Sequence, residues 1–211
     1  MESRPISVCV FNLVAAALLA AMLVIAPAAF PSTTAPLIPV ASAQCPDAEV
    51  VFARGRFEPP GVGAVGDVLV GALRSKTPLS VGVYGVNYVA DTDAAAGATD
   101  MRQHVQSMAK SCPNTRMILG GYSLGATAAD LMTRANRLSP SERQHVAAVV
   151  MFGNGARLLG PAPAYADRTI DQCANGDPIC GKGFNWDSHL QPSYIDSGLV
   201  DQAAGRIAGM L

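Results

Sequence analysis

The chain has 211 residues, of which 50% are hydrophobic and 15% are charged, and its formal net charge is −1. This length suits one domain with a sizeable core and is short for two. Because no long basic or acidic run occurs, we expect neither nucleic acid nor an anionic membrane surface as a partner.

The first 43 residues are predicted to be a signal peptide. Residues 13–26 form an apolar run that has the length of a signal-peptide core and is shorter than a bilayer-spanning helix. A later A-S-A sequence of the small-x-small type indicates cleavage after Ala43. We therefore expect a secreted protein, extracellular or associated with the cell wall, with residues 44–211 as its single domain. An uncleaved anchor is the alternative.

Apolar runs of strand length alternate with segments of helical periodicity in the rest of the chain. In chain order we predict a strand at 48–53, a helix at 62–75, a strand at 81–88, a helix at 99–110, a strand at 116–120, a helix at 124–138, a strand at 146–152, a strand at 168–172 and a helix at 195–211. Thr99 is the expected N-cap of the second helix. The alternation predicts an α/β fold, with a mostly parallel sheet covered by helices on both faces.

The cysteines agree with export. Cys9 leaves with the signal peptide, and the even number that remains indicates two disulfides in an oxidising compartment. The remaining cysteines are Cys45, Cys112, Cys173 and Cys180. Three pairings are open. The last two cysteines are close enough to close a short loop, and the first two each precede a predicted strand, so that neighbouring parallel strands would bring them together.

The sequence G-Y-S-L-G at residues 121–125 matches the pattern G-x-S-x-G. As a string the match is weak, since roughly one chain in eight of this composition would contain such a match by chance. Its position is more informative, because it lies between a predicted strand and a predicted helix, where α/β hydrolases have their nucleophile elbow. The glycines allow a strained serine backbone, and the following helix offers free N–H groups to a developing negative charge. Ser123 is therefore the candidate nucleophile, with a tight turn without chemistry as the alternative.

A serine nucleophile needs a base, and in this fold class the acid and then the histidine follow the serine along the chain. His104 falls on a predicted helix and His145 just before a predicted strand, and both are expected at the surface. His189 follows the last predicted strand, in a loop expected at the same sheet edge as Ser123. It is therefore the candidate base.

The acid must precede the histidine and be held firmly. Asp177 fits best, because it lies within C-A-N-G-D-P-I-C, a loop that a disulfide would close. Asp171 and Asp187 are the alternatives, although Asp187 is too close to His189 in sequence for easy triad geometry.

At these residues the chain resembles the cutinase family. The resemblance covers essentially all of the mature chain, and its motifs are F-A-R-G after the first cysteine, G-G-Y-S-L-G, A-D-R-T, the C-x3-D-x2-C segment and a late histidine followed by leucine. The chain looks most similar to the secreted cutinase-like serine esterases of actinobacteria. The resemblance implies a lidless α/β hydrolase with five parallel strands that hydrolyses carboxylic esters.

The resemblance also implies roles for individual residues. It implies a triad of Ser123, Asp177 and His189, and an oxyanion hole made by the N–H groups of Leu124 and Arg56. Better-known members of the family carry Ser or Thr at the position of Arg56, and that hydroxyl helps to hold the oxyanion. Arginine cannot take this role unchanged. The implied disulfides are Cys45–Cys112 and Cys173–Cys180.

We therefore predict a secreted serine esterase that works through an acyl-enzyme on Ser123, with short to medium acyl chains, lipids or polyesters as candidate substrates. We expect no cofactor, no metal, no stable membrane insertion after cleavage, and a monomer. The alternatives are a weakly active or non-catalytic secreted binding protein, which Arg56 favours, and an acyltransferase or peptidase with the same triad. Five residues of the loops expected near the site are candidates for an apolar rim around an acyl chain, with ordinary loop packing as the alternative for each: Phe57, Val62, Phe184, Trp186 and Leu190.

The sequence G-V-G-A-V-G at residues 61–66 could mark a dinucleotide site. That fingerprint requires a tight turn directly after a strand. Residues 54–60, with two prolines, intervene here, and an exported protein rarely meets free dinucleotide. We therefore set this interpretation aside.

Overall fold

The computed structural model describes residues 45–211. The expected signal peptide and its cleavage point after Ala43 lie outside the described residues. Within the described part of the chain, no helix combines the length and the hydropathy that crossing a membrane requires.

The centre of the fold is a sheet of five parallel strands in the order β2-β1-β3-β4-β5. The strands are β1 (Ala48–Ala53), β2 (Val81–Gly85), β3 (Arg116–Tyr122), β4 (Val146–Phe152) and β5 (Thr169–Gln172). Across the middle of the sheet, Val51 lies opposite Leu119, which in turn lies opposite Val149. All five strands occur where the sequence predicts them, and the α/β class with its parallel sheet is confirmed.

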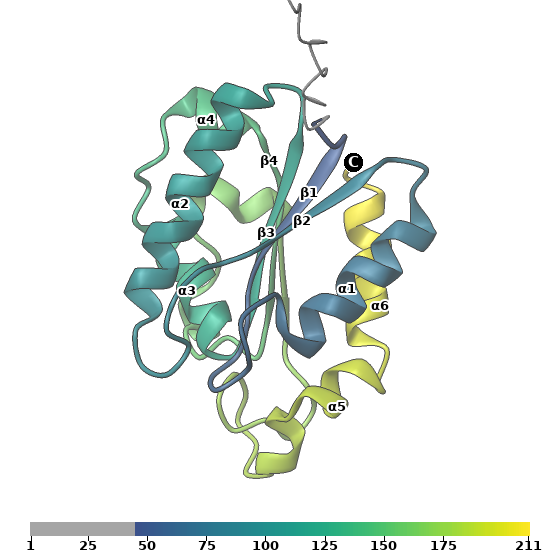
Figure 1. The fold of residues 1–211 in the computed structure, drawn as a ribbon. Helices are drawn as coiled ribbons and strands as arrows, with labels where there is room; N and C mark the ends of the chain where they lie inside the picture. The colour runs from purple at the N-terminus through teal and green to yellow at the C-terminus, as the bar shows by residue number, and fades with distance from the viewer. Residues whose placement is uncertain (1–44) are drawn as a thin grey trace, which may run out of the picture. The chain divides into compact units, whose positions relative to one another are not determined.

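Helices cover both faces of the sheet, with α1 and α6 on one face and α2 and α3 on the other (Figure 1). The helices are α1 (Gly63–Lys76), α2 (Ala94–Ser111), α3 (Leu124–Arg134), α4 (Pro140–Gln144), α5 (Gln191–Ile195) and α6 (Leu199–Ala208). Short 3-10 helices lie in the loops at η1 (Arg157–Leu159), η2 (Pro163–Arg168) and η3 (Trp186–His189).

The core has two halves, one on each face of the sheet. In β1, Val50 and Phe52 pack in the half that α1 and α6 cover, whereas Val51 and Ala53 pack in the half that α2 and α3 cover. Successive side chains of a strand point to opposite faces, so covering both faces buries the whole strand. This explains why β1 and β4 read as nearly unbroken apolar runs with the bounds that the sequence predicts.

The start of α2 differs from the prediction. The helix begins at Ala94, and its N-cap is Asp93, whose carboxylate accepts from the N–H of Ala96 at 2.8 Å. Thr99 lies inside the helix, and its hydroxyl donates to the carbonyl of Ala95. Thr99 as N-cap was therefore wrong, because an earlier residue supplies a better cap.

The last helix begins later than the predicted residue 195, because Ile195 ends the separate helix α5 and α6 starts at Leu199. Gly198 adopts φ of 78°, a left-handed conformation that interrupts the helical backbone between α5 and α6. The apolar stripe at every fourth residue continues through the break, so periodicity alone predicts one helix. The third predicted helix also ends early, at Arg134, and α4 follows with a capping box formed by Ser139 and Glu142.

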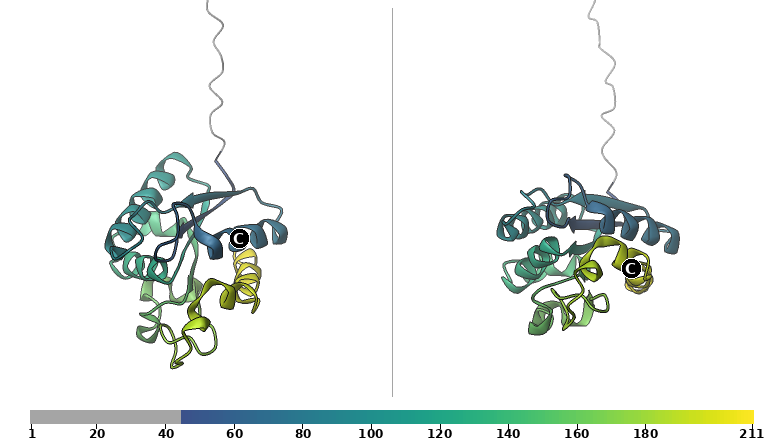
Figure 2. Two further views of the ribbon diagram at one scale, coloured as in Figure 1. Left: turned by 60° about the horizontal axis from the view of Figure 1, so that its bottom comes forward. Right: turned by 90° about the horizontal axis from the view of Figure 1, so that it is seen from below.

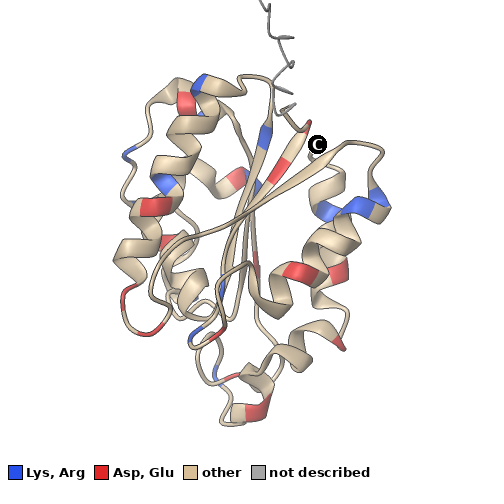
Figure 3. Cartoon of the chain, in the orientation of Figure 1, with Lys and Arg blue, Asp and Glu red and all other residues tan. Residues whose placement is uncertain are grey.

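The carboxyl ends of the parallel strands meet at one edge of the sheet, which is the lower edge in Figure 1. The view from below in Figure 2 looks onto the loops and short helices gathered there. Figure 3 shows charged residues of both signs scattered over the helices and loops of the described chain. Since ligands of open α/β sheets bind at this edge, it is where the candidate site should lie.

Candidate active site

Ser123 stands on the sharp turn between β3 and α3. Its φ is 55°, which is unfavourable for a residue with a side chain, and its N–H donates to the carbonyl of Phe152 at 2.9 Å. A Cβ at Gly121 would lie 2.1 Å from the carbonyl oxygen of Gly125, and one at Gly125 would lie 1.9 Å from that of Ala53. Both glycines are therefore needed for the turn, and the predicted elbow is present.

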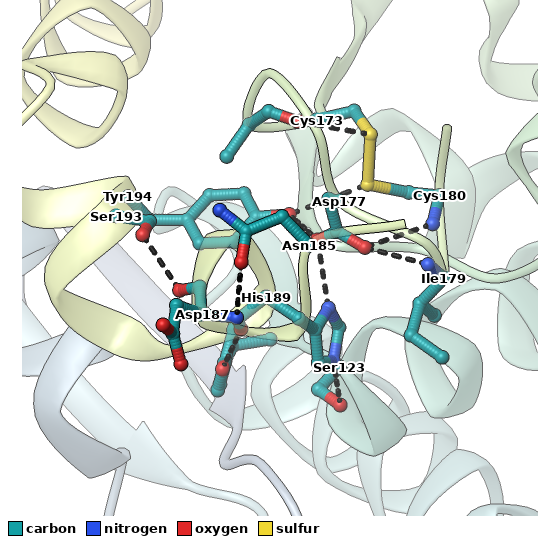
Figure 4. A network of polar contacts seen from close by, with 12 residues as sticks. Ser123, Cys173, Asp177, Ile179, Cys180, Asn185, Asp187, His189, Ser193 and Tyr194 are labelled. Carbon is teal, nitrogen blue, oxygen red and sulfur yellow. Dashed lines mark hydrogen bonds and ion pairs between the residues drawn. A yellow bond between two sulfur atoms is a disulfide. The ribbon is translucent and has the colours of Figure 1, made fainter. Parts of the chain in front are cut away.

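The candidate nucleophile, base and acid lie in series (Figure 4). The Ser123 hydroxyl is 2.8 Å from Nε2 of His189, and Nδ1 of the same ring is 2.7 Å from Oδ2 of Asp177. The side chain of His189 is 13% exposed and that of Asp177 is fully buried. The structure thus brings together the three residues that the sequence proposes for the triad, one from the turn between β3 and α3 and two from the segment between β5 and α5.

The Asp177 carboxylate is fully buried and accepts hydrogen bonds on both oxygens. Oδ1 accepts from the N–H groups of Ile179 at 2.6 Å and Cys180 at 3.3 Å, and Oδ2 accepts from His189 and from the hydroxyl of Tyr194. Burial acts to raise the pKa of Asp177, but the hydrogen bonds from Tyr194, His189 and Ile179 outweigh it, so the pKa lies below its ordinary value. The group is therefore a carboxylate throughout the neutral pH range.

The two disulfides have the pairing that the resemblance implies. Cys173–Cys180 closes the loop that carries Asp177, and the N–H of Cys180 is one of the donors to its carboxylate. Cys45–Cys112 joins the residues that precede β1 and β3, at the opposite edge of the sheet. One disulfide therefore supports the candidate acid, and the other lies remote from it.

Exchanging both members of a disulfide for serine should separate these two roles. Cys173→Ser with Cys180→Ser should lose esterase activity at temperatures where the helical circular dichroism signal is intact, because the Asp177 loop loosens. The matched control, Cys45→Ser with Cys112→Ser, should lower the melting temperature more. The disulfide that closes the longer loop restricts the unfolded chain more and stabilises the fold by about 4.4 kcal/mol, against about 2.5 kcal/mol for the short one. Equal loss of activity and helical signal in the first variant would remove the role of the short disulfide in the site.

The other two histidines lie outside this arrangement. His104 is partly buried rather than at the surface, because its ring stacks on Tyr84 with a centroid distance of 3.6 Å and its Nε2 is 2.8 Å from the Glu49 carboxylate. The surface expectation for His104 was therefore wrong. His145 follows α4 and is half-exposed.

The alternative acids do not face His189. Asp171 lies on β5, where Oδ2 accepts from the amide of Asn154 at 3.0 Å, and burial raises the pKa of its carboxyl group to about 6. Asp187 lies on η3, where its main chain binds Asn185 and Ser193.

The loop after β1 is held by polar contacts that sequence reasoning missed. The buried guanidinium of Arg54 donates to the carbonyls of Glu58, Val86 and Tyr88. The last two follow β2, which ends at Gly85 instead of residue 88. The Glu58 carboxylate accepts from two N–H groups, those of Gly55 and Ala64. These contacts fix the loop that carries Arg56.

Both candidate oxyanion donors have suitable surroundings. Leu124 is the first residue of α3, so helix geometry gives its N–H no acceptor within the helix. Beside Arg56, Gly55 donates to Glu58 and Phe57 donates to the carbonyl of Ala90. The N–H of Arg56 lies between these two occupied donors.

The side chain of Arg56 is bound to Asp91, which lies in the loop after β2. Its Nε donates to the carbonyl of Asp91, the Asp91 carboxylate is 3.7 Å away, and the guanidinium lies over the ring of Phe57. Glu58, the acidic residue nearest to Arg56 along the chain, does not pair with it, because its carboxylate is occupied by backbone donors.

Two buried tyrosines also belong to the arrangement and had no sequence signal. Tyr122 precedes the nucleophile, stacks on the ring of His189 and donates its hydroxyl to the carbonyl of His189. Tyr194 donates to Asp177. Gly153 completes the close packing, because a Cβ there would lie 2.9 Å from Cε1 of His189.

The parallel sheet, the elbow after β3 and the histidine and aspartate at the same edge define an α/β hydrolase. Residues 44–210 match the family model described as Cutinase. A probable carboxylesterase Culp2 of Mycobacterium tuberculosis is 49% identical over 93% of this chain and 94% of its own, and the phospholipase Culp4 of that organism is 45% identical over 95% and 91%.

Solved structures agree with these relatives. A Trichoderma reesei cutinase in complex with a phosphonate inhibitor is 30% identical, with a TM-score of 0.66 over 79% of this chain and 77% of its own. The chain belongs to the cutinase family, as the sequence resemblance implies, and it is a carboxylic ester hydrolase.

Proposed function

We propose that the chain is a secreted serine esterase that hydrolyses apolar carboxylic esters through an acyl-enzyme on Ser123. The observation that carries this proposal is the series of hydrogen bonds from Ser123 through His189 to the buried Asp177, at 2.8 Å and 2.7 Å. Such a series activates a serine hydroxyl, which is a weak nucleophile without a neighbouring base.

In the first half of the reaction, Nε2 of His189 takes the hydroxyl proton as Oγ of Ser123 attacks the ester carbonyl. The N–H groups of Leu124 and Arg56 hold the oxyanion of the tetrahedral intermediate. The intermediate collapses, the bond to the alcohol oxygen breaks, and His189 returns the proton to the leaving alcohol. Water then attacks the acyl-enzyme by the same route, releasing the acid and restoring Ser123.

Asp177 supports this cycle without exchanging a proton itself. Its Oδ2 lies 2.7 Å from Nδ1 of His189, which keeps the proton of the neutral ring on Nδ1 and leaves Nε2 free to accept. Its negative charge also stabilises the imidazolium that forms during attack.

An apolar rim supports the choice of substrate. Seven large hydrophobic side chains of the described chain are more than half exposed, and all seven lie in loops that follow the carboxyl ends of strands: Phe57, Val89, Leu158, Leu159, Phe184, Trp186 and Leu190. The prediction that Val62 belongs to the rim was wrong, since this residue is buried in the core beside α1. A rim of this kind suits an acyl chain or a lipid-like ester.

Two experiments test the proposal. The purified protein should hydrolyse p-nitrophenyl esters, with the highest kcat/KM for short or medium acyl chains, and fail to do so if it is a binding protein. For secretion, the culture medium of an expressing cell should contain a protein whose first residue is Gln44. Recovery only in the cell membrane with an intact N-terminus would favour an uncleaved anchor.

Arg56 should limit the rate on neutral esters. Arg56→Ser should raise kcat about tenfold or more with little change in KM, because a serine hydroxyl at this position can turn toward the oxyanion, whereas the guanidinium lies on Asp91. The matched control, Arg56→Ala, removes the guanidinium without adding a donor and should give no such rise. If both variants lose activity, Arg56 itself serves the reaction, and esters that carry an anionic group become the better substrates to test.

A further inference from the structure

The hydroxyl of Tyr194 occupies a specific place beside the candidate triad. It donates to Oδ2 of Asp177, which is the oxygen that accepts from Nδ1 of His189 (Figure 4). Among the described residues, Tyr194 and His189 are the two whose side chains donate to this carboxylate, and its other donors are backbone N–H groups. A neutral donor and the base therefore share one oxygen of the acid.

The tyrosine ring is firmly placed. Tyr194 is fully buried, its ring meets those of Tyr122 and Phe152 edge to face, and its hydroxyl lies 3.3 Å from the Cys180 sulfur of the short disulfide. Burial, and then the hydrogen bond to Asp177, raise the pKa of Tyr194 well above its usual range, so the phenol stays a donor wherever the esterase works.

A carboxylate can rotate about its Cβ–Cγ bond unless both oxygens are held. The backbone N–H groups of Ile179 and Cys180 hold Oδ1, and the Tyr194 hydroxyl holds Oδ2 from a different element, α5. Because α5 begins two residues after His189, the base and the tyrosine approach the acid on one continuous segment.

We propose that Tyr194 is a positioning residue, whose hydroxyl holds the Asp177 carboxylate in the orientation that orders His189 and draws part of its negative charge away from the ring. This inference rests on the proposed triad. It assigns Tyr194 no contact with substrate, so its effect should appear in the reaction step and in the pH dependence, and not in substrate binding.

The test is Tyr194→Phe in the mature protein, assayed on a soluble p-nitrophenyl ester from pH 5 to 9. We expect kcat on the alkaline plateau to fall about tenfold with KM unchanged, since the lost bond is to a charged acceptor. The acidic limb of the kcat/KM profile should move to higher pH by about 0.5 units or more, because a carboxylate with one donor fewer attracts the protonated ring more strongly.

The matched control is Tyr165→Phe. Tyr165 is buried to the same degree on η2, in the core half opposite to that of Tyr194. Removing the Tyr165 hydroxyl should change at most the melting temperature and leave kcat and the acidic limb of the pH profile unchanged. If Tyr194→Phe keeps the wild-type kcat, or loses kcat without any movement of the limb, Tyr194 is only a packing residue and the inference is wrong.

A second measurement tests the inference if the Tyr194→Phe variant does not fold. Incorporating 3-fluorotyrosine at position 194 keeps the hydroxyl but makes it a stronger donor, so the acidic limb should move to lower pH. An unmoved limb overturns the inference. Ser123→Ala separates this failure from that of the proposed function: if Ser123→Ala keeps its turnover, the triad is wrong, whereas an inactive Ser123→Ala beside an unaltered Tyr194→Phe rejects the role of Tyr194 alone.

Discussion

Ser123→Ala should lower kcat on p-nitrophenyl esters by on the order of 10⁴-fold or more. The hydroxyl that lies 2.8 Å from Nε2 of His189 is the group that would form the acyl-enzyme, and within the described residues no second nucleophile occupies that position. Alanine has a Cβ like serine, so the strained φ of 55° is not changed by the substitution. Circular dichroism and melting temperature should therefore match those of the wild type.

The control for Ser123→Ala is Ser188→Ala. Ser188 is buried on η3 directly before His189, and its side chain lies near Gly176 of the disulfide loop. Its loss should leave turnover within a few-fold of the wild type. If Ser123→Ala instead retained most of the turnover, the reaction would not pass through this serine.

Asp177→Asn should lower kcat by on the order of 10³- to 10⁴-fold, close to the cost of losing the nucleophile. An amide can donate to Nδ1 of His189 and so place the ring proton on Nε2, which then cannot accept from Ser123. The backbone N–H groups of Ile179 and Cys180 can still donate to the amide oxygen, so the fold should persist. Steady-state kinetics and a melting curve of the same preparation measure both effects.

The matched control is Asp171→Asn, which changes the alternative acid. Turnover should stay within a few-fold of the wild type, because Asp171 binds Asn154 and not His189. Burial raises the pKa of Asp171 to about 6 in the folded protein, so its ionisation opposes folding as the pH rises through that value. The variant should therefore be no less stable than the wild type at pH 8. A large loss of turnover in Asp171→Asn would reverse the assignment of the acid.

The same linkage has the opposite sign for Asp177. Its pKa lies below the ordinary value in the folded protein, so its contribution to stability is present above the unfolded pKa of about 3.9 and is lost as the pH falls through the lower folded value. Asp177→Asn should therefore flatten the acid side of the stability curve.

Much of the fold could be predicted because both faces of the sheet are covered. Strands buried on both sides leave apolar runs whose ends are marked in the sequence, and β1 and β4 have the predicted bounds. The ends of the helices were harder to predict, since a single contact or a single residue conformation decides where a helix begins or ends. Asp93 caps α2 six residues before Thr99, the predicted cap, and Gly198 interrupts the helix although the apolar stripe continues past it.

The proposed triad could be selected from sequence because its members are few and ordered. The chain has three histidines, and only His189 follows both the elbow and a suitable acid. The supporting contacts could not be predicted, because they join residues distant along the chain. Tyr122 reaches His189 across 67 positions, and Tyr194 reaches Asp177 across 17, with no local pattern to mark either contact. Arg54 likewise binds carbonyls of a different loop, and its place in the F-A-R-G motif gives no indication of these partners.

The most direct measurement of the central claim is the site of covalent labelling by a fluorophosphonate, which is attacked only by an activated nucleophile. After labelling and trypsin digestion, mass spectrometry should place one phosphonyl group on the peptide of residues 117–134, whose only serine is Ser123. Labelling should proceed in step with the loss of esterase activity and should be absent from Ser123→Ala. Full inactivation with the label on another peptide, or turnover that persists after Ser123 is fully labelled, would contradict the account.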